Sequence, residues 1–221
     1  MHLFQAASRA VTLALVSFPL QVHAQNLTVR FFQNSPDSCN YNESSRALTF
    51  TASSIPIDGV CLSLEKLFGG NTTRGFVNHT DLRIDPQSGD IGLHWQVENA
   101  DMYDSQANYS SVLYRQYFAN PPSDDLEPGN QAYRALTLYP HEDCMDVGPQ
   151  GRGWYGFSCW SEDEGSCGTA PWNILSIGVQ EKRSWDQCWV FALYGAAGRG
   201  YSSSQAMIGA FLSASLAIWL A

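Results

Sequence analysis

The stretch at 91–97 reads IGLHWQV, and apolar residues occupy every second position in it. Because successive side chains of a strand point to opposite faces, the stretch predicts a strand with one buried and one solvated face. The segment DLRI at 81–84 and the turn-forming segment DPQSGD at 85–90 precede it. Together the three segments predict an antiparallel hairpin.

Similar short runs of β-branched and aromatic residues recur along the chain, separated by Gly, Pro, Asn, Asp and Ser. The runs are LTVRFF (27–32), ALTFTA (47–52), VCLSLEKLF (60–68), SVLYRQYF (111–118), YRALTLY (133–139), WYGFSCW (154–160), ILSIGVQ (174–180) and CWVFALY (188–194). The run at 111–118 also fits a short helix. The run at 188–194 is apolar on both faces, which predicts a central strand. The spacing predicts an all-β fold, an antiparallel β-sandwich of about nine or ten strands.

The two ends of the chain carry targeting patterns. Residues 1–24 combine a basic residue, an apolar run and VHA at the end, which predicts a secretory signal peptide cleaved after Ala24. At the other end, GAA at 195–197, a polar spacer and an uncharged tail at 206–221 predict glycosylphosphatidylinositol attachment. We expect attachment at Gly195, with Ala196 or Gly198 as rivals; a tail anchor or a C-terminal core helix is the alternative. A single extracellular domain at 25–195 would remain, with 196–221 removed.

The chain is acidic, with a formal net charge of −9. Each end that we expect to be removed carries one arginine and no acid, so the domain at 25–195 is more acidic still. Such a surface repels phosphate groups, which argues against binding to nucleic acid and against electrostatic docking on anionic lipid. A neutral or cationic ligand is compatible with this charge.

Six cysteines fall inside 25–195: Cys39, Cys61, Cys144, Cys159, Cys167 and Cys188. They predict three disulfides rather than a zinc site, because the compartment is oxidising and no pair has C-x-x-C spacing. Cys39 and Cys61 are far from the others in the sequence, so we expect them to pair with each other. Cys159 and Cys188 lie in strand-like runs and would bridge neighbouring strands. That choice leaves Cys144 with Cys167.

Five N-glycosylation sequons begin at Asn26, Asn42, Asn71, Asn78 and Asn108. In a chain with a signal peptide they predict glycans on exposed residues. No sequon follows Asn108, so the C-terminal half is expected to carry no sugar.

No reaction motif stands out. The nearest nucleophile pattern, GFSCW at 156–160, lacks the second glycine of a hydrolase elbow. The mature chain keeps three histidines without metal-ligand spacing, so we expect neither a metal nor another cofactor; they are His79, His94 and His141. Signal-peptide cleavage two residues earlier would expose His23 as the first residue, the feature of copper-binding histidine-brace proteins.

Paired carboxylates for glycoside hydrolysis can be drawn from many acids. The candidates are Glu98, Asp101, Asp104, Glu142, Asp143 and the run at 162–164. An acidic surface supplies such pairs without catalysis. The run at 162–164 could also bind Ca²⁺, but it lacks a recognisable loop pattern, and we interpret it as a solvated turn.

Aromatic residues in the run at 154–160 offer a candidate ligand site. A period of two puts Tyr155, Phe157 and Cys159 on the core face, with Trp154 and Trp160 on the opposite face. Two indoles flanking small residues could stack on sugar rings or receive a protein partner. The alternative is that this face is covered and that both indoles belong to the core. We name Trp154, Trp160 and, in the segment after them, Trp172 as candidate ligand-binding residues.

The combination of signal peptide, clustered sequons, six cysteines, β pattern and lipid-anchor tail resembles the small cysteine-rich, glycosylphosphatidylinositol-anchored glycoproteins of fungal cell surfaces. The resemblance is one of architecture and assigns no functional residue. It implies a place at the outer plasma membrane or cell wall. Our first hypothesis is a non-enzymatic surface module that binds wall carbohydrate or another surface protein. A wall-acting carbohydrate enzyme with a carboxylate pair is the second, and a copper-binding protein is the third.

Overall fold

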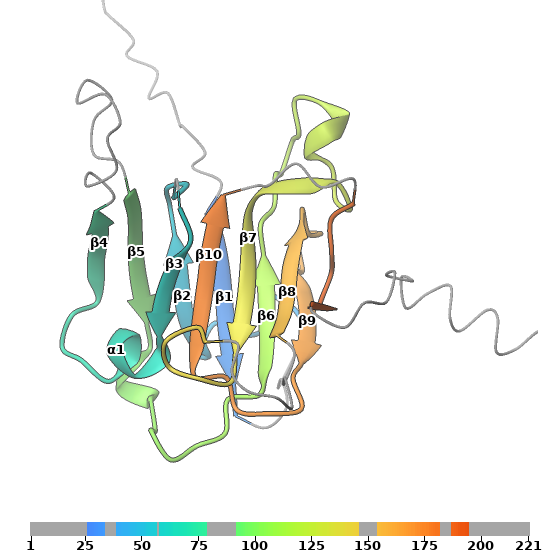
Figure 1. Cartoon of the computed structure of the whole chain (residues 1–221). Helices are drawn as coiled ribbons and strands as arrows, with labels where there is room; N and C mark the ends of the chain where they lie inside the picture. The colour runs from blue at the N-terminus through green and yellow to red at the C-terminus, as the bar shows by residue number, and fades with distance from the viewer. Residues whose placement is uncertain are drawn as a thin grey trace, which may run out of the picture.

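The computed structural model describes residues 26–33, 39–56, 58–78, 92–145, 154–181 and 187–194. In these residues eleven strands form two antiparallel sheets that pack face to face, with one five-residue α-helix and two short 3-10 turns (Figure 1). The all-β sandwich expected from the sequence is confirmed. The segments 1–24 and 196–221, for which a signal peptide and a lipid-attachment signal are expected, lie outside the described residues. Among the described helices, none has the length and apolar character needed to cross a membrane.

One sheet has six strands in the order β4-β5-β2-β1-β6-β9. These strands are β1 (Leu27–Phe32), β2 (Leu48–Ala52), β4 (Arg74–Asn78), β5 (Gly92–Glu98), β6 (Ser111–Arg115) and β9 (Ser166–Thr169). The helical turns η1 (Ala100–Met102) and η2 (Asp124–Leu126) lie in its connections.

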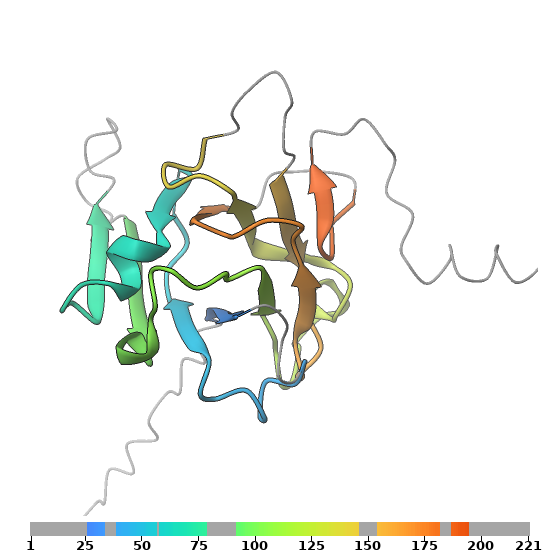
Figure 2. The same ribbon diagram turned by 90° about the horizontal axis from the view of Figure 1, so that it is seen from below.

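The second sheet has five strands in the order β11-β8-β7-β10-β3. These strands are β3 (Val60–Ser63), β7 (Gln131–Tyr139), β8 (Trp154–Cys159), β10 (Ser176–Glu181) and β11 (Ala192–Tyr194). The helix α1 (Leu64–Phe68) follows β3 directly. Figure 2 shows the two sheets from below, with α1 beside β3 and with β4 and β5 beyond it.

The core lies between the two sheets and follows the expected alternation. On β5, Leu93 and Val97 are buried while His94 and Glu98 are exposed. Every second residue of the neighbouring strands contributes to the same core, including Leu27, Val29, Phe31, Phe50, Val112, Tyr114, Leu136, Leu138, Phe157, Ile177 and Val179. This interdigitation of two apolar faces is the main source of stability for a sandwich.

One expected element lies outside the described residues, and another differs in the structure. The segment at 81–84 lies outside the described residues, and the strands that pair with β5 are β4 and β2. The run at 60–68 divides after Ser63, because Leu64, Leu67 and Phe68 recur at helical spacing and bury one face of α1.

The prediction of a central strand at 188–194 is wrong. Only Ala192–Tyr194 forms a strand, β11, and it lies at the edge of the five-stranded sheet. The apolar residues that precede β11 have different environments. Val190 is 56% exposed, whereas Phe191 has a φ of 50° and stacks on Tyr155 with ring centroids 4.6 Å apart. The run is therefore apolar because it closes the end of the core, not because both faces of a strand are covered.

Three disulfides are present, as expected, but two of the expected pairings are wrong. The bridges are Cys39–Cys167, Cys61–Cys144 and Cys159–Cys188. Cys61 belongs to β3 of the five-stranded sheet, while Cys39 follows β1 and faces β9 of the other sheet. Because the two residues belong to different sheets, each pairs with the nearest segment of its own sheet. Only the bridge between Cys159 and Cys188 matches the prediction.

The five sequon asparagines are all exposed. Asn26 precedes β1, and Asn42 lies between β1 and β2. Asn71 precedes β4, Asn78 is the last residue of β4, and Asn108 precedes β6. All five thus lie on the six-stranded sheet or on connections into it. Glycans at these positions would leave the five-stranded sheet bare.

Candidate functional site

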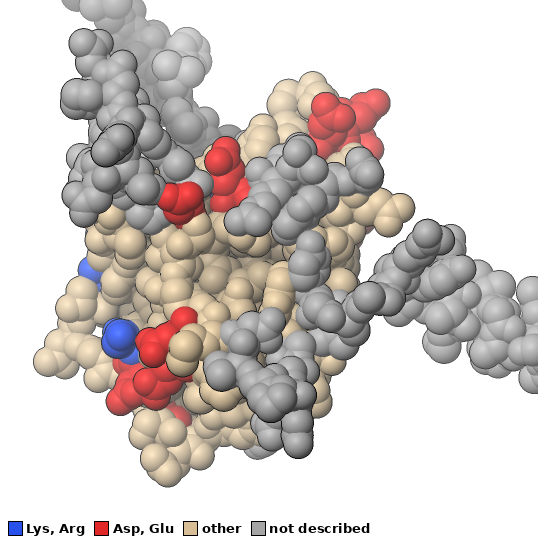
Figure 3. Space-filling model, in the orientation of Figure 1, with Lys and Arg blue, Asp and Glu red and all other residues tan. Residues whose placement is uncertain are grey.

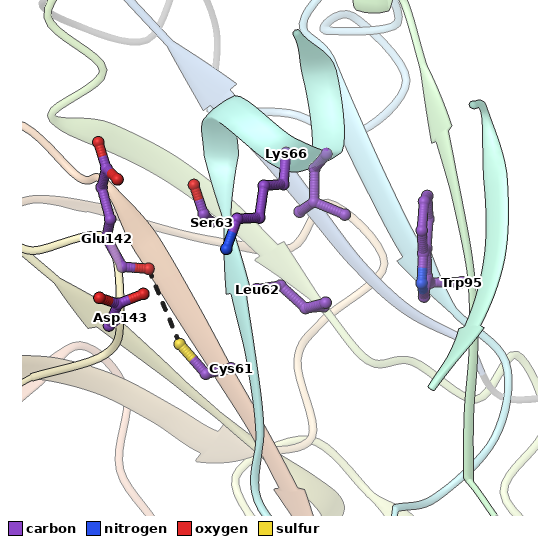
Figure 4. Close-up of a pocket in the computed structure, with 8 residues that line it drawn as sticks. Cys61, Leu62, Ser63, Lys66, Trp95, Glu142 and Asp143 are labelled. Carbon is purple, nitrogen blue, oxygen red and sulfur yellow. Dashed lines mark hydrogen bonds between the residues drawn. The ribbon is translucent and has the colours of Figure 1, made fainter. Parts of the chain in front are cut away.

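A cleft opens where the six-stranded sheet extends past the edge of the five-stranded sheet. The strand β3 ends the smaller sheet, whereas β5 and β4 continue the larger one beyond it. The inner face of β5 is therefore not fully covered by the opposite sheet. The resulting cleft has a volume of about 210 Å³. Its lining residues are Cys61, Leu62, Ser63, Lys66, Leu67, Trp95, Glu142 and Asp143 (Figure 4). We call it the Trp95 cleft.

Trp95 forms one wall of this cleft. It lies opposite Gly75 in the register of β4 and β5. A Cβ atom on Gly75 would lie only 2.3 Å from Cζ2 of the indole, so the ring lies directly against the backbone of β4. Figure 4 shows the ring across the cleft from Glu142 and Asp143, with Leu62 and Lys66 between. The absence of a side chain at residue 75 thus lets the indole form a broad apolar wall.

Lys66 and Ser63 enter the cleft from the junction of β3 and α1. Leu64, Leu67 and Phe68 form the buried face of α1, which leaves Lys66 exposed on the other face. Ser63 precedes the helix but makes no side-chain capping hydrogen bond. Ser63 is 4% exposed, and its Oγ atom has no hydrogen-bond partner among the described residues. A buried hydroxyl in this state costs about 1–3 kcal/mol, which a ligand or water that reached it would remove.

Glu142 and Asp143 lie on the loop that follows β7, and this loop is fixed at two points. The disulfide to Cys61 ties Cys144 to β3. The backbone N–H of Cys144 donates to Ser176 Oγ on β10 at 3.0 Å, and that hydroxyl donates to the carbonyl oxygen of His141. Both carboxylates are exposed. The loop therefore presents two acids at a fixed position before any ligand binds.

The lining combines an aromatic wall, an ammonium group and two carboxylates. Pockets for small ligands combine apolar walls with a few polar groups that fix orientation, and this cleft has that composition. No group of three or more His, Cys, Asp or Glu side chains in the described ranges is placed to hold a metal ion. His94, one of the three candidate histidines, stacks on Phe76 with ring centroids 4.2 Å apart. His23 and His79 lie outside the described ranges.

The three tryptophans named from the sequence do not form a site together. Trp160 is 1% exposed and packs edge-on against Phe118 and Tyr133. Trp172 is buried at 8% exposure, near Tyr155. Trp154 is half-buried beside Tyr139. The smooth strip between two open indoles is therefore absent.

For Trp160 the alternative holds: its indole belongs to the core, and β8 ends just before it at Cys159. The pairing of β7 with β8 is irregular between Gln131 and Leu136, where the start of β7 bends (Figure 1). Tyr133, in this bent part of β7, packs edge-on against Trp160. The core face itself was predicted correctly, since Phe157 and Cys159 are buried and Tyr155 packs against the core.

The remaining candidate acids are scattered. Asp163 forms an ion pair with Arg115 at 2.5 Å. Glu98 and Asp101 line a separate hollow on the six-stranded sheet, with β4. Of the acids named from the sequence, the structure places only Glu142 and Asp143 in the Trp95 cleft.

The sequence pattern did not predict Trp95, Lys66 or Ser63 as site residues. The alternation correctly placed Trp95 on the inner face of β5. That face, however, extends beyond the edge of the opposite sheet. The spacing of Leu64, Leu67 and Phe68 could have revealed the helical turn that exposes Lys66.

Comparison with known proteins identified no relative of the chain. No family model, no curated protein and no solved structure matched the chain.

Proposed function

We propose that the chain is an extracellular, lipid-anchored glycoprotein that binds carbohydrate in the Trp95 cleft without transforming it. The observation that carries this proposal is the indole wall of Trp95 opposite Glu142 and Asp143, with Lys66 between them. The exposure of all five sequon asparagines agrees with a secreted glycoprotein.

The chemistry of this lining suits a saccharide. The apolar C–H face of a sugar ring packs on an aromatic face, and buried aromatic contacts supply much of the energy of small interfaces. Sugar hydroxyls donate to carboxylates and accept from an ammonium group, and hydrogen bonds to charged partners are the stronger ones. The Trp95 cleft offers both kinds of contact on opposite walls.

Binding is favoured over hydrolysis by the placement of the acids. A glycoside hydrolase acts through two carboxylates on either side of the scissile bond. Glu142 and Asp143 are consecutive residues of one loop on one wall, and the opposite wall carries Trp95. The two carboxylates therefore contact a bound sugar from one side only.

Titration of the purified full chain with soluble β-glucan, chitin and mannan oligosaccharides tests this proposal. We expect a change in tryptophan fluorescence with at least one of them, and unchanged oligosaccharides on product analysis. Absence of binding to all three classes, and to glucosamine oligosaccharides with free amines, would refute the proposal. Release of shorter sugars, lost in Glu142→Gln or Asp143→Asn, would establish the carboxylate-pair enzyme instead.

The anchoring part of the proposal has a separate test. Treatment of intact expressing cells with a phosphatidylinositol-specific phospholipase should release the chain into the medium. Retention on the cells after this treatment would favour the tail-anchor alternative.

A further inference from the structure

We propose that the saccharide bound in the Trp95 cleft carries a protonated amine, so that its chemical class is a hexosamine with a free amino group. This inference rests on the proposed carbohydrate-binding function and specifies its ligand. It derives from the balance of charges in and beside the cleft.

Carboxylates outnumber ammonium groups in this region. Among the described residues that line the cleft, Lys66 is the only basic one, against Glu142 and Asp143. A neighbouring hollow shares Ser63 and Glu142 with the cleft and adds Glu65. Figure 3 shows acidic side chains grouped around a basic one over this part of the surface. A ligand with a positive charge is therefore attracted, and a uronic acid is repelled.

These carboxylates form no ion pair with another described residue. Within the ranges that the structure describes, the only salt bridge joins Arg115 to Asp163, remote from the cleft. Glu142 and Asp143 are exposed acceptors on a loop held by a disulfide. A carboxylate that is already positioned loses less entropy when a cation binds to it, which favours affinity.

The opposite wall favours the same ligand class. A cation over the face of a tryptophan is attracted by the ring quadrupole, and recognition of ammonium groups commonly uses this contact. A ring bearing an amine that sits between Trp95 and the two acids meets attraction from both sides. The buried Ser63 hydroxyl, which has no partner among the described residues, adds a hydrogen-bonding group on the side of the cleft near Lys66 and Glu142.

The test compares a glucosamine tetramer with its fully N-acetylated counterpart, by calorimetry on the full chain at a pH where the amines are protonated. We expect the amine form to bind roughly tenfold more tightly, the gain of two partly solvated ion pairs. Glu142→Gln with Asp143→Asn should erase this preference. Lys66→Met should increase it, because the substitution removes the competing ammonium group.

A control for general acidity is Asp124→Asn with Asp125→Asn, two exposed charges on η2 outside the cleft. This pair should leave the preference intact. A loss of preference equal to that of the cleft variants would show diffuse attraction and overturn the inference. Equal or tighter binding of the N-acetylated tetramer, still abolished by Trp95→Ala, would overturn the inference and leave the proposed function standing. Absence of binding to either tetramer and to glucan and mannan would overturn the proposed function itself.

Discussion

Substitution of Gly75 by alanine should move the indole of Trp95. A Cβ atom at residue 75 would lie 2.3 Å from Cζ2, 2.5 Å from Cε2 and 2.8 Å from Nε1 of that ring. The ring would have to withdraw by about 1.1 Å to restore an ordinary contact of 3.4 Å. Overpacking of this kind costs about 1–3 kcal/mol. Because β4 lies at the edge of its sheet, the strand can shift with the ring, so we expect the lower half of that range.

The assay combines thermal unfolding with saccharide titration. For a chain of this size, each kcal/mol corresponds to roughly 2–4 °C in Tm. We therefore expect Gly75→Ala to lower Tm by a few degrees and to weaken saccharide binding about tenfold. The matched control is Gly59→Ala, where an added Cβ would meet only Gln180 Cβ at 3.9 Å. If Gly75→Ala leaves both Tm and affinity as they are in the control, the indole does not lie on β4 and the reasoning fails.

Three further predictions concern the frame around the site. Replacement of Cys61 and Cys144 by serine should lower stability by about 2–4 kcal/mol in urea unfolding and weaken saccharide binding, and an unchanged affinity would show that the loop is held without the bridge. Burial raises the pKa of Tyr114, so the unfolded chain loses this proton above pH 10 while the folded chain keeps it, and stability falls. Urea unfolding at pH 9, 10 and 11 measures the free energy of unfolding of both chains. Above pH 10, Tyr114→Phe should lose about 1.4 kcal/mol less stability per pH unit than the unchanged chain. An equal dependence on pH in the two chains would contradict the raised pKa of Tyr114. Gly168→Ala should lower Tm, because an added Cβ would lie 1.9 Å from Cδ2 of Phe191; an unchanged Tm would mean that the ring has room to move.

Much of the fold was predictable because burial imposes a period of two on each strand. The strand at 27–32 has the expected bounds, and the alternation at Leu93 and Val97 matches their burial. Period alone shows neither where a strand ends nor whether its outer face is covered, so the sequence left both an open and a covered face possible for Trp160.

The site was less predictable because it depends on how the sheets overlap. Trp95 has the pattern of a core residue, and only the greater width of the six-stranded sheet exposes part of it to a cleft. The disulfides show the same limit. Distance along the sequence paired Cys39 with Cys61, whereas the sheet to which each strand belongs decides the bridges.

The most direct test of the account compares Trp95→Ala with Trp154→Ala in saccharide titrations of the full chain. Trp154 is also half-buried but lies on β8, away from the cleft, so it controls for the loss of an indole. We expect Trp95→Ala to weaken binding by about tenfold or more, as for an aromatic residue at the centre of a binding site, and Trp154→Ala to leave it unchanged. Loss of binding in Trp154→Ala with full binding in Trp95→Ala would contradict the account and place the site on the five-stranded sheet.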